Sequence, residues 1–169
     1  MAADVKTLEE TQQETLGQAL GKLPSGVFIV TTVGATGETL GMLASFVQQI
    51  SFKPPMICLA TQPGRAFYEL LQQTGVLTLN ILPAEGATSL MKAFSSPNPD
   101  AFDQIAHKKT AFGVDLDDAL AVLHAQVTQI IEPTTGDHHL VLAALKAGRL
   151  LQPIEAKPMV HLRKSGFNY

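Results

Sequence analysis

The 169-residue chain contains one cysteine, Cys58, and no tryptophan. A single cysteine excludes a disulfide within the chain and any CxxC redox or zinc motif, which suits a reducing cytoplasm. Twelve Lys and Arg stand against fifteen Asp and Glu, and these charges are scattered along the sequence. No basic surface for nucleic acid or anionic lipid is visible, so we expect neither nucleic acid nor a membrane as a partner.

Targeting segments and long apolar runs are also missing. Residues 1–14 are polar and acidic, without the positive start and apolar run of a signal peptide. Every other apolar run falls far below the roughly 18 residues of a membrane-spanning helix. We therefore expect a soluble, cytoplasmic protein.

Several well-known catalytic motifs are absent as well. The chain has no GxGxxG, GxxxxGK[ST], HExxH or GxSxG sequence. Nucleotide-binding folds, zincin proteases and α/β-hydrolases thereby lose their best-known signatures. A reaction driven by a protein side chain is not indicated.

The composition is that of one folded domain. With 46% hydrophobic and 16% charged residues, the chain is apolar enough for a substantial core. Its length is close to the roughly 150 residues of an ordinary domain. We expect a single domain over residues 1–169, with an N-terminal helix in 1–23 and a β-barrel over 24–169.

The local patterns predict mostly strands. Apolar residues at helical spacing over Thr7–Leu23 predict an amphipathic helix. It should stop near Gly21, where glycine supports a left-handed cap, or before Pro24, because proline disfavours helix in the residue before it. β-Branched runs predict a hairpin of Val27–Val33 and Thr39–Val47. Further strands are predicted at Met56–Thr61, Val76–Leu82, Leu120–Glu132, His138–Leu150 and Met159–Leu162, and short helices at Arg65–Gln73 and Glu85–Phe94. Strands in runs, without regular alternation with helices, favour a mainly β class and an antiparallel Greek-key barrel with short helices.

The turn Gln62–Ala66 is the first candidate for a binding site. It ends a predicted strand and opens a predicted helix, where free backbone N–H groups attract anions. Arg65 can add charge-assisted hydrogen bonds to a phosphate. The alternative is a solvated arginine on the first turn of a helix.

The stretch Gly41–Phe46 is the second candidate. Small residues within a strand allow a ligand to approach the backbone closely. Packing of this strand against another layer explains the same pattern.

The histidines form the third candidate, in the sequence Gly136-Asp137-His138-His139. Successive strand residues point to opposite sides, so one histidine can face a ligand while the other faces solvent. Adjacent histidines are poor joint ligands for one metal, and we expect no metal site. A hairpin turn with polar strand residues is the alternative.

Cys58 and the acidic stretch after residue 114 are given no catalytic role. Cys58 lies in an apolar strand, where a thiol is usually inert. Asp115, Asp117 and Asp118 fall in a loop-like stretch, which we interpret as a solvated turn.

Taken together, the segments resemble the flavin reductase-like family, whose fold is the FMN-binding split barrel. The resemblance is closest to the C-terminal flavin reductase module of flavodiiron proteins of photosynthetic organisms. The matching segments are LGKLPSGVFIVTT, GMLASFVQQISFKPP, PGRAFYEL, VLTLNIL, FSSPNPDAFD, GDHHLVLAALKAG and HLRKSGFNY. They extend from about residue 16 to the end of the chain, and their combination is far more specific than any one of them.

The resemblance implies a homodimer with one FMN, or an FAD-derived flavin, in each subunit near the dimer interface. The residues implied to line the flavin ring are Met42, Leu43, Ala44, Ser45 and Phe46. Gly64 and Arg65 would hold the phosphate, and Asn80 would lie at a strand end beside the flavin. His138 would lie near the nicotinamide, and Arg163 and Tyr169 match the basic and aromatic positions of the C-terminal segment.

The function that this resemblance implies is an NAD(P)H-dependent flavin reductase. NAD(P)H would be the co-substrate, and electrons would pass to an acceptor or to a fused or separate flavodiiron-type partner. The alternative is an FMN-binding electron-transfer module that does not oxidise NAD(P)H itself. A third hypothesis is a split barrel that binds heme or no cofactor, with His138 and His161 as the candidate axial ligands.

Overall fold

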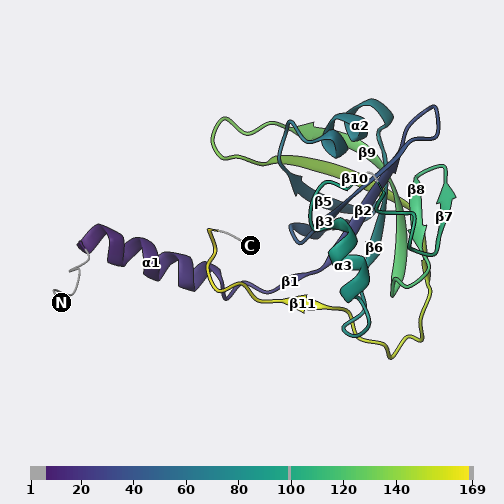
Figure 1. Ribbon diagram of the computed structural model, residues 1–169. Coiled ribbons are helices and arrows are strands. Elements are labelled where there is room, and N and C mark those ends of the chain that lie inside the picture. The colour runs from purple at the N-terminus through teal and green to yellow at the C-terminus, as the bar shows by residue number, and fades with distance from the viewer. Residues whose placement is uncertain (1–6, 99, 168–169) are drawn as a thin grey trace. The chain divides into compact units, whose positions relative to one another are not determined.

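The computed structural model describes residues 7–98 and 100–167 (Figure 1). It divides into two compact units. One unit combines the N-terminal segment up to Ser25 with the C-terminal segment from Val160, and the other comprises Gly26–Met159. The expectation of a single domain over the whole chain stays a prediction.

The terminal unit contains helix α1 (Leu8–Leu20). Its N-terminus is a capping box, in which the Glu10 amide donates to Thr7 Oγ1 at 3.2 Å and the Thr7 amide donates to Glu10 Oε2 at 2.7 Å. The helix ends at Gly21 as predicted, but Gly21 is right-handed, with φ −62°, so the left-handed cap was wrong. The C-terminal segment packs on this helix, because the Gly166 amide donates to the Gly17 carbonyl at 2.7 Å.

The main sheet belongs to the larger unit and is antiparallel throughout. Its spatial order is β3 (Thr39–Ala44), β2 (Phe28–Val33), β6 (Val76–Ile81), β9 (Ala121–Ile131), β10 (His139–Leu150), β5 (Pro55–Thr61) and β4 (Val47–Phe52). The other elements of this unit are α2 (Ala66–Thr74), α3 (Thr88–Phe94) and the hairpin β7 (His107–Thr110) and β8 (Gly113–Leu116). The short strands β1 (Ser25–Gly26) and β11 (Val160–His161) form a two-stranded sheet.

The mainly β class is confirmed. The sheet is open, with β3 and β4 as its two edges, so closure into a barrel stays a prediction. The predicted hairpin is present, because β2 pairs with β3 from Phe28↔Ala44 to Val33↔Thr39.

One predicted strand, Thr39–Val47, was wrong in its extent. The strand ends at Ala44, and a separate strand begins at Val47 and pairs with β5 instead of β2. The chain leaves its first partner at Ser45, and the Phe46 carbonyl then accepts from the Ala60 amide at 2.9 Å. The apolar pattern runs through this change of partner and does not reveal it.

The two faces of the sheet carry separate core clusters. Ile29 packs in one cluster and its neighbour Val30 in the other, as expected for adjacent residues of one strand. Helix α3 and strand β8 contribute Leu90, Phe94, Val114 and Leu116 to the first cluster. Helix α2 contributes Phe67 and Leu71 to the second. Helix α2 packs on β2 and β3, and this packing fixes the position of the helix start that follows β5, where the predicted phosphate turn lies.

Candidate functional site

The turn between β5 and α2 has the geometry of an anion-binding site. Gly64 adopts φ +75°, which favours glycine, and a Cβ there would meet no atom within 4 Å. Arg65 is the N-cap of α2, with extended backbone (φ −90°, ψ 139°), and no side chain caps this helix. The first N–H groups of a helix have no partner within it, so they can donate to a bound anion. The exposed Arg65 adds a positive charge at the same place.

A chain of side-chain hydrogen bonds connects this turn to the turn before β10. Arg65 Nη2 donates to Gln62 Oε1 at 2.6 Å, and Gln62 Nε2 donates to Asp137 Oδ2 at 3.3 Å. Asp137 Oδ1 meets His138 Nδ1 at 2.7 Å. The hydrogen bond from His138, followed by that from Gln62, lowers the pKa of Asp137. The structure thus brings Arg65 and His138, two residues singled out in the sequence, into one polar network.

Phe46 and Met42 border the same end of the sheet. The ring of Phe46 lies 5.5 Å from that of His138, in an edge-to-face arrangement. Met42 Sδ accepts a hydrogen bond from Thr61 Oγ1 at 3.6 Å, and Thr61 pairs with His139 in the sheet. We call Met42, Phe46, Gln62, Arg65, Asp137 and His138 the candidate site.

The other residues of the predicted ring-binding stretch lie beside Met42 and Phe46. Leu43 packs against the core cluster that contains Ile29. Ala44 and Ser45 are buried. Their contacts with a flavin ring stay a prediction.

Asn80 lies apart from the candidate site, in the interior of the sheet. Its Nδ2 donates to the carbonyls of Ile29 at 3.2 Å and Val114 at 3.0 Å. Its Oδ1 accepts from the Leu116 amide at 2.8 Å. The side chain, which is fully buried, therefore holds β2, β6 and β8 together. This is a structural role that the sequence did not indicate, and the flavin contact stays a prediction.

The C-terminal candidates belong to the terminal unit. Arg163 Nη1 donates to the Gly166 carbonyl at 3.3 Å. Tyr169 lies outside the described residues. Roles for both side chains at a flavin site stay predictions.

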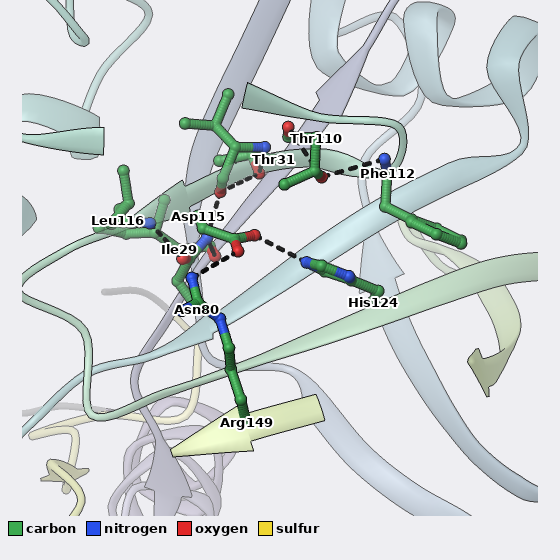
Figure 2. Close-up of polar contacts among 11 residues, drawn as sticks. Ile29, Thr31, Asn80, Thr110, Phe112, Asp115, Leu116, His124 and Arg149 are labelled. Carbon is green, nitrogen blue, oxygen red and sulfur yellow. Dashed lines mark hydrogen bonds and ion pairs between the residues drawn. The ribbon is translucent and has the colours of Figure 1, made fainter. Parts of the chain in front are cut away.

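A second polar network was missed by the sequence reasoning (Figure 2). Asp115 was expected in a solvated turn, which is wrong, because it lies in β8 with 2% of its surface exposed. Its Oδ1 meets His124 Nε2 at 2.7 Å, and its Oδ2 accepts from Arg149 Nη2 at 3.0 Å. The ring of Phe112 stacks on His124, with 10° between the planes. The partners of Asp115 lie on β9 and β10, so no local pattern could have shown this cluster.

Tyr68 and His139 form another pair that the sequence did not reveal. The Tyr68 hydroxyl lies 2.7 Å from His139 Nδ1. Tyr68 is buried, and burial, followed by the charge of Glu132, raises the pKa of its hydroxyl. This contact ties α2 to the start of β10, directly behind the candidate site.

The described part of the chain offers neither a group of metal-ligating side chains nor a helix that could span a membrane. Over residues 7–98 and 100–167, no group of three His, Cys, Asp or Glu side chains could hold a metal ion. None of the described helices has the length and apolar character needed to cross a membrane. Cys58 is partly buried, and desolvation raises the pKa of its thiol.

Comparisons with known proteins connect this geometry to one family. A family model described as "Flavin reductase like domain" matches residues 20–168. Diflavin flavoprotein A 1 of Synechocystis sp. is 35% identical over 173 residues, covering 99% of this chain and 29% of that protein. The chain spans less than a third of the length of the curated relatives that it matches.

Solved structures of other proteins have a similar fold. Nitrilotriacetate monooxygenase component B from Mycobacterium thermoresistibile superposes with a TM-score of 0.78 and 25% identity, covering 92% of this chain and 86% of that chain. The NADH:FAD oxidoreductase SgcE6 of Streptomyces globisporus, solved with NAD and FAD fragments, has a TM-score of 0.78 and 21% identity. That match covers 98% of this chain and 94% of the other, and it shows a shared fold. With the family match over nearly its whole length, the chain belongs to the flavin reductase-like domain family, and its role is a flavin-related redox one.

Proposed function

We propose that the protein is an NAD(P)H-dependent flavin reductase that binds FMN at the candidate site. The observation that carries this proposal is the hydrogen-bonded chain from Arg65 to His138. It joins an anion-binding helix start to a histidine at the end of the neighbouring strand. A phosphate-bearing flavin needs the first feature, and a nicotinamide that approaches the flavin ring can be oriented by the second.

The phosphate of FMN fits the turn before α2. Gly64 leaves the backbone open, the helix start offers N–H donors, and Arg65 offers a guanidinium. Only Nη2 of Arg65 is engaged by Gln62, so other N–H groups of the guanidinium can meet a phosphate. FAD would place its first phosphate at the same turn.

The flavin ring would lie along Met42–Phe46. When bound, the flavin supplies the redox chemistry of hydride acceptance, and the protein supplies binding, orientation and polar groups. Backbone N–H groups of this stretch would face the polar edge of the ring, and the Phe46 ring would border it on the His138 side.

His138 would orient the nicotinamide. Asp137 engages Nδ1 of the imidazole, which fixes the orientation of the ring. Nε2 would then be the nitrogen that meets the nicotinamide. His138 is three-quarters buried in its side chain, at 25% exposure, so its orientation is constrained by packing as well.

The wider architecture that we propose is a split barrel in a cytoplasmic homodimer, with the flavin near the interface between subunits. The family match and the similar structures support the flavin reductase-like fold of this arrangement. Electrons would pass from the flavin to an acceptor or to a flavodiiron-type module.

An FMN-binding electron-transfer module is the second candidate function. It is favoured by one observation: this chain corresponds to 29% of Diflavin flavoprotein A 1, a much longer protein with other parts. In that case a partner would reduce the flavin.

An anaerobic titration separates the two functions. The purified protein, loaded with FMN, is titrated with NADH and separately with NADPH while the flavin absorbance is followed. A reductase loses its yellow colour at about one nicotinamide per flavin. A protein that binds FMN but stays yellow is an electron-transfer module, and a protein that binds no FMN contradicts both functions.

A further inference from the structure

Gln62 occupies a specific position between the two halves of the candidate site. Its carbonyl accepts from the cation Arg65 at 2.6 Å, and its amide donates to the carboxylate of Asp137 at 3.3 Å. Each end of the amide therefore faces the charge that suits it. Gln62 is the side chain through which the helix-start turn reaches the turn that carries His138.

The segments that Gln62 connects are also held together behind it. Thr61 pairs with His139 in the sheet, and the Tyr68 hydroxyl bonds His139 Nδ1 at 2.7 Å. These contacts fix the main chain on both sides of the Gln62 bridge. A change in the side chains of the bridge therefore acts on Arg65 and His138 without first moving the strands.

The chemistry of Arg65 makes the bridge sensitive to a phosphate. A guanidinium has five N–H donors in a rigid plane, and Gln62 uses one nitrogen of that plane. A phosphate can bind the remaining N–H donors only when the guanidinium plane of Arg65 is suitably oriented. The same bond therefore orients Arg65 for an anion and orients the Gln62 amide toward Asp137.

We propose that Gln62 is a positioning residue that couples phosphate binding at Arg65 to the orientation of His138 through Asp137. This inference rests on the proposed function. It goes further, because it assigns a role to a glutamine that contacts neither the reacting atoms nor the nicotinamide. The consequence is that FMN orders the nicotinamide side of the site more than riboflavin does, since riboflavin has no phosphate.

The test replaces Gln62 by methionine, which has similar length and no amide. FMN and riboflavin are titrated into wild-type protein and into Gln62→Met, and both dissociation constants are measured. We expect FMN to bind about threefold to tenfold more weakly to the variant, the effect of one ordinary hydrogen bond, with riboflavin binding unchanged. Unchanged riboflavin binding also shows that the variant is folded.

A second readout follows the coupling itself. The imidazole nitrogens of His138 are observed by NMR in the complexes with FMN and with riboflavin. Wild-type protein should show a shift difference between the two flavins, and Gln62→Met should lose it. The matched control is Gln49→Met, because Gln49 is exposed and its amide donates to the Ser51 carbonyl within its own strand. The control should behave as wild type.

The outcomes separate the inference from the function on which it rests. Equal losses for FMN and riboflavin, unchanged FMN binding, or a His138 shift difference that survives in Gln62→Met would each overturn the role of Gln62. If those results come from protein that binds FMN and oxidises NADH, the proposed function stands. Protein that binds neither flavin overturns both.

Discussion

Two aspartate–histidine pairs of the larger unit have the same contact distance, but their aspartates have opposite surroundings. Asp115 meets His124 at 2.7 Å, and Asp137 meets His138 at 2.7 Å. The Asp115 side chain is 3% exposed, whereas that of Asp137 is 79% exposed. A buried carboxylate depends on its partners for its stability, while an exposed one is solvated by water. The first pair therefore stabilises the fold, whereas a ligand contact by the second pair belongs to the proposed function.

The largest expected effect comes from removing the buried carboxylate. Asp115→Ala leaves His124 and Arg149 without their shared acceptor and leaves a cavity at a buried position of β8. We expect the free energy of unfolding to fall by about 3 kcal/mol. This is the lower end of the range for removing one partner of a buried ion pair, because the side chain of Arg149 is 53% exposed. Urea denaturation measures the loss. Asp117→Ala, at an exposed neighbour, should stay within about 0.5 kcal/mol of wild type, and an equal loss would refute the distinction.

The next effect concerns His138, the histidine of the second pair. His138→Ala should slow reduction of bound FMN by NADH about tenfold, which is roughly 1.4 kcal/mol, because the nicotinamide loses an orienting group. Flavin affinity should change less than the rate. Stopped-flow traces of the reductive half-reaction give the rate. An unchanged rate would remove His138 from the nicotinamide side.

The smallest effect is the pH response of Asp137. The pKa of Asp137 is lowered in the folded protein, mainly by the hydrogen bond from His138 and then by that from Gln62. The ionised carboxylate therefore stabilises the folded state fully above the ordinary aspartate pKa of about 4. This stabilisation is lost as the pH falls through the lowered pKa of Asp137 in the folded protein. NMR titration of the Asp137 carboxyl carbon measures that value, and His138→Ala should raise it. A pKa unaffected by this substitution would show that the pair does not form in solution.

The sequence predicted the elements better than their partners. β-Branched runs located β2, β5, β6, β9 and β10 to within a few residues, because local composition decides whether a segment is extended. Strand β4 and the hairpin β7–β8 were missed: β7 reads HKKT, which has no apolar alternation, and the change of partner at Ser45 leaves no local trace.

The candidate site shows the same limit. The turn chemistry of Gly64-Arg65 and the segment Gly136-Asp137-His138-His139 were visible in the sequence, because each consists of neighbouring residues, but the contact between Asp137 and His138 was not predicted. The Gln62 bridge joins residues 75 positions apart, and Asp115 finds its partner Arg149 34 positions away. Contacts of this kind depend on sheet register, which one sequence does not reveal.

The most direct test of the account compares FMN with riboflavin on Arg65→Ala. The central claim is that the turn before α2 holds the phosphate of a flavin. Equilibrium titrations of wild type, Arg65→Ala and the exposed control Lys108→Ala should show FMN binding weakened about tenfold or more in Arg65→Ala alone, with riboflavin binding unchanged. Equal weakening of both flavins, or no weakening of either, would contradict the claim.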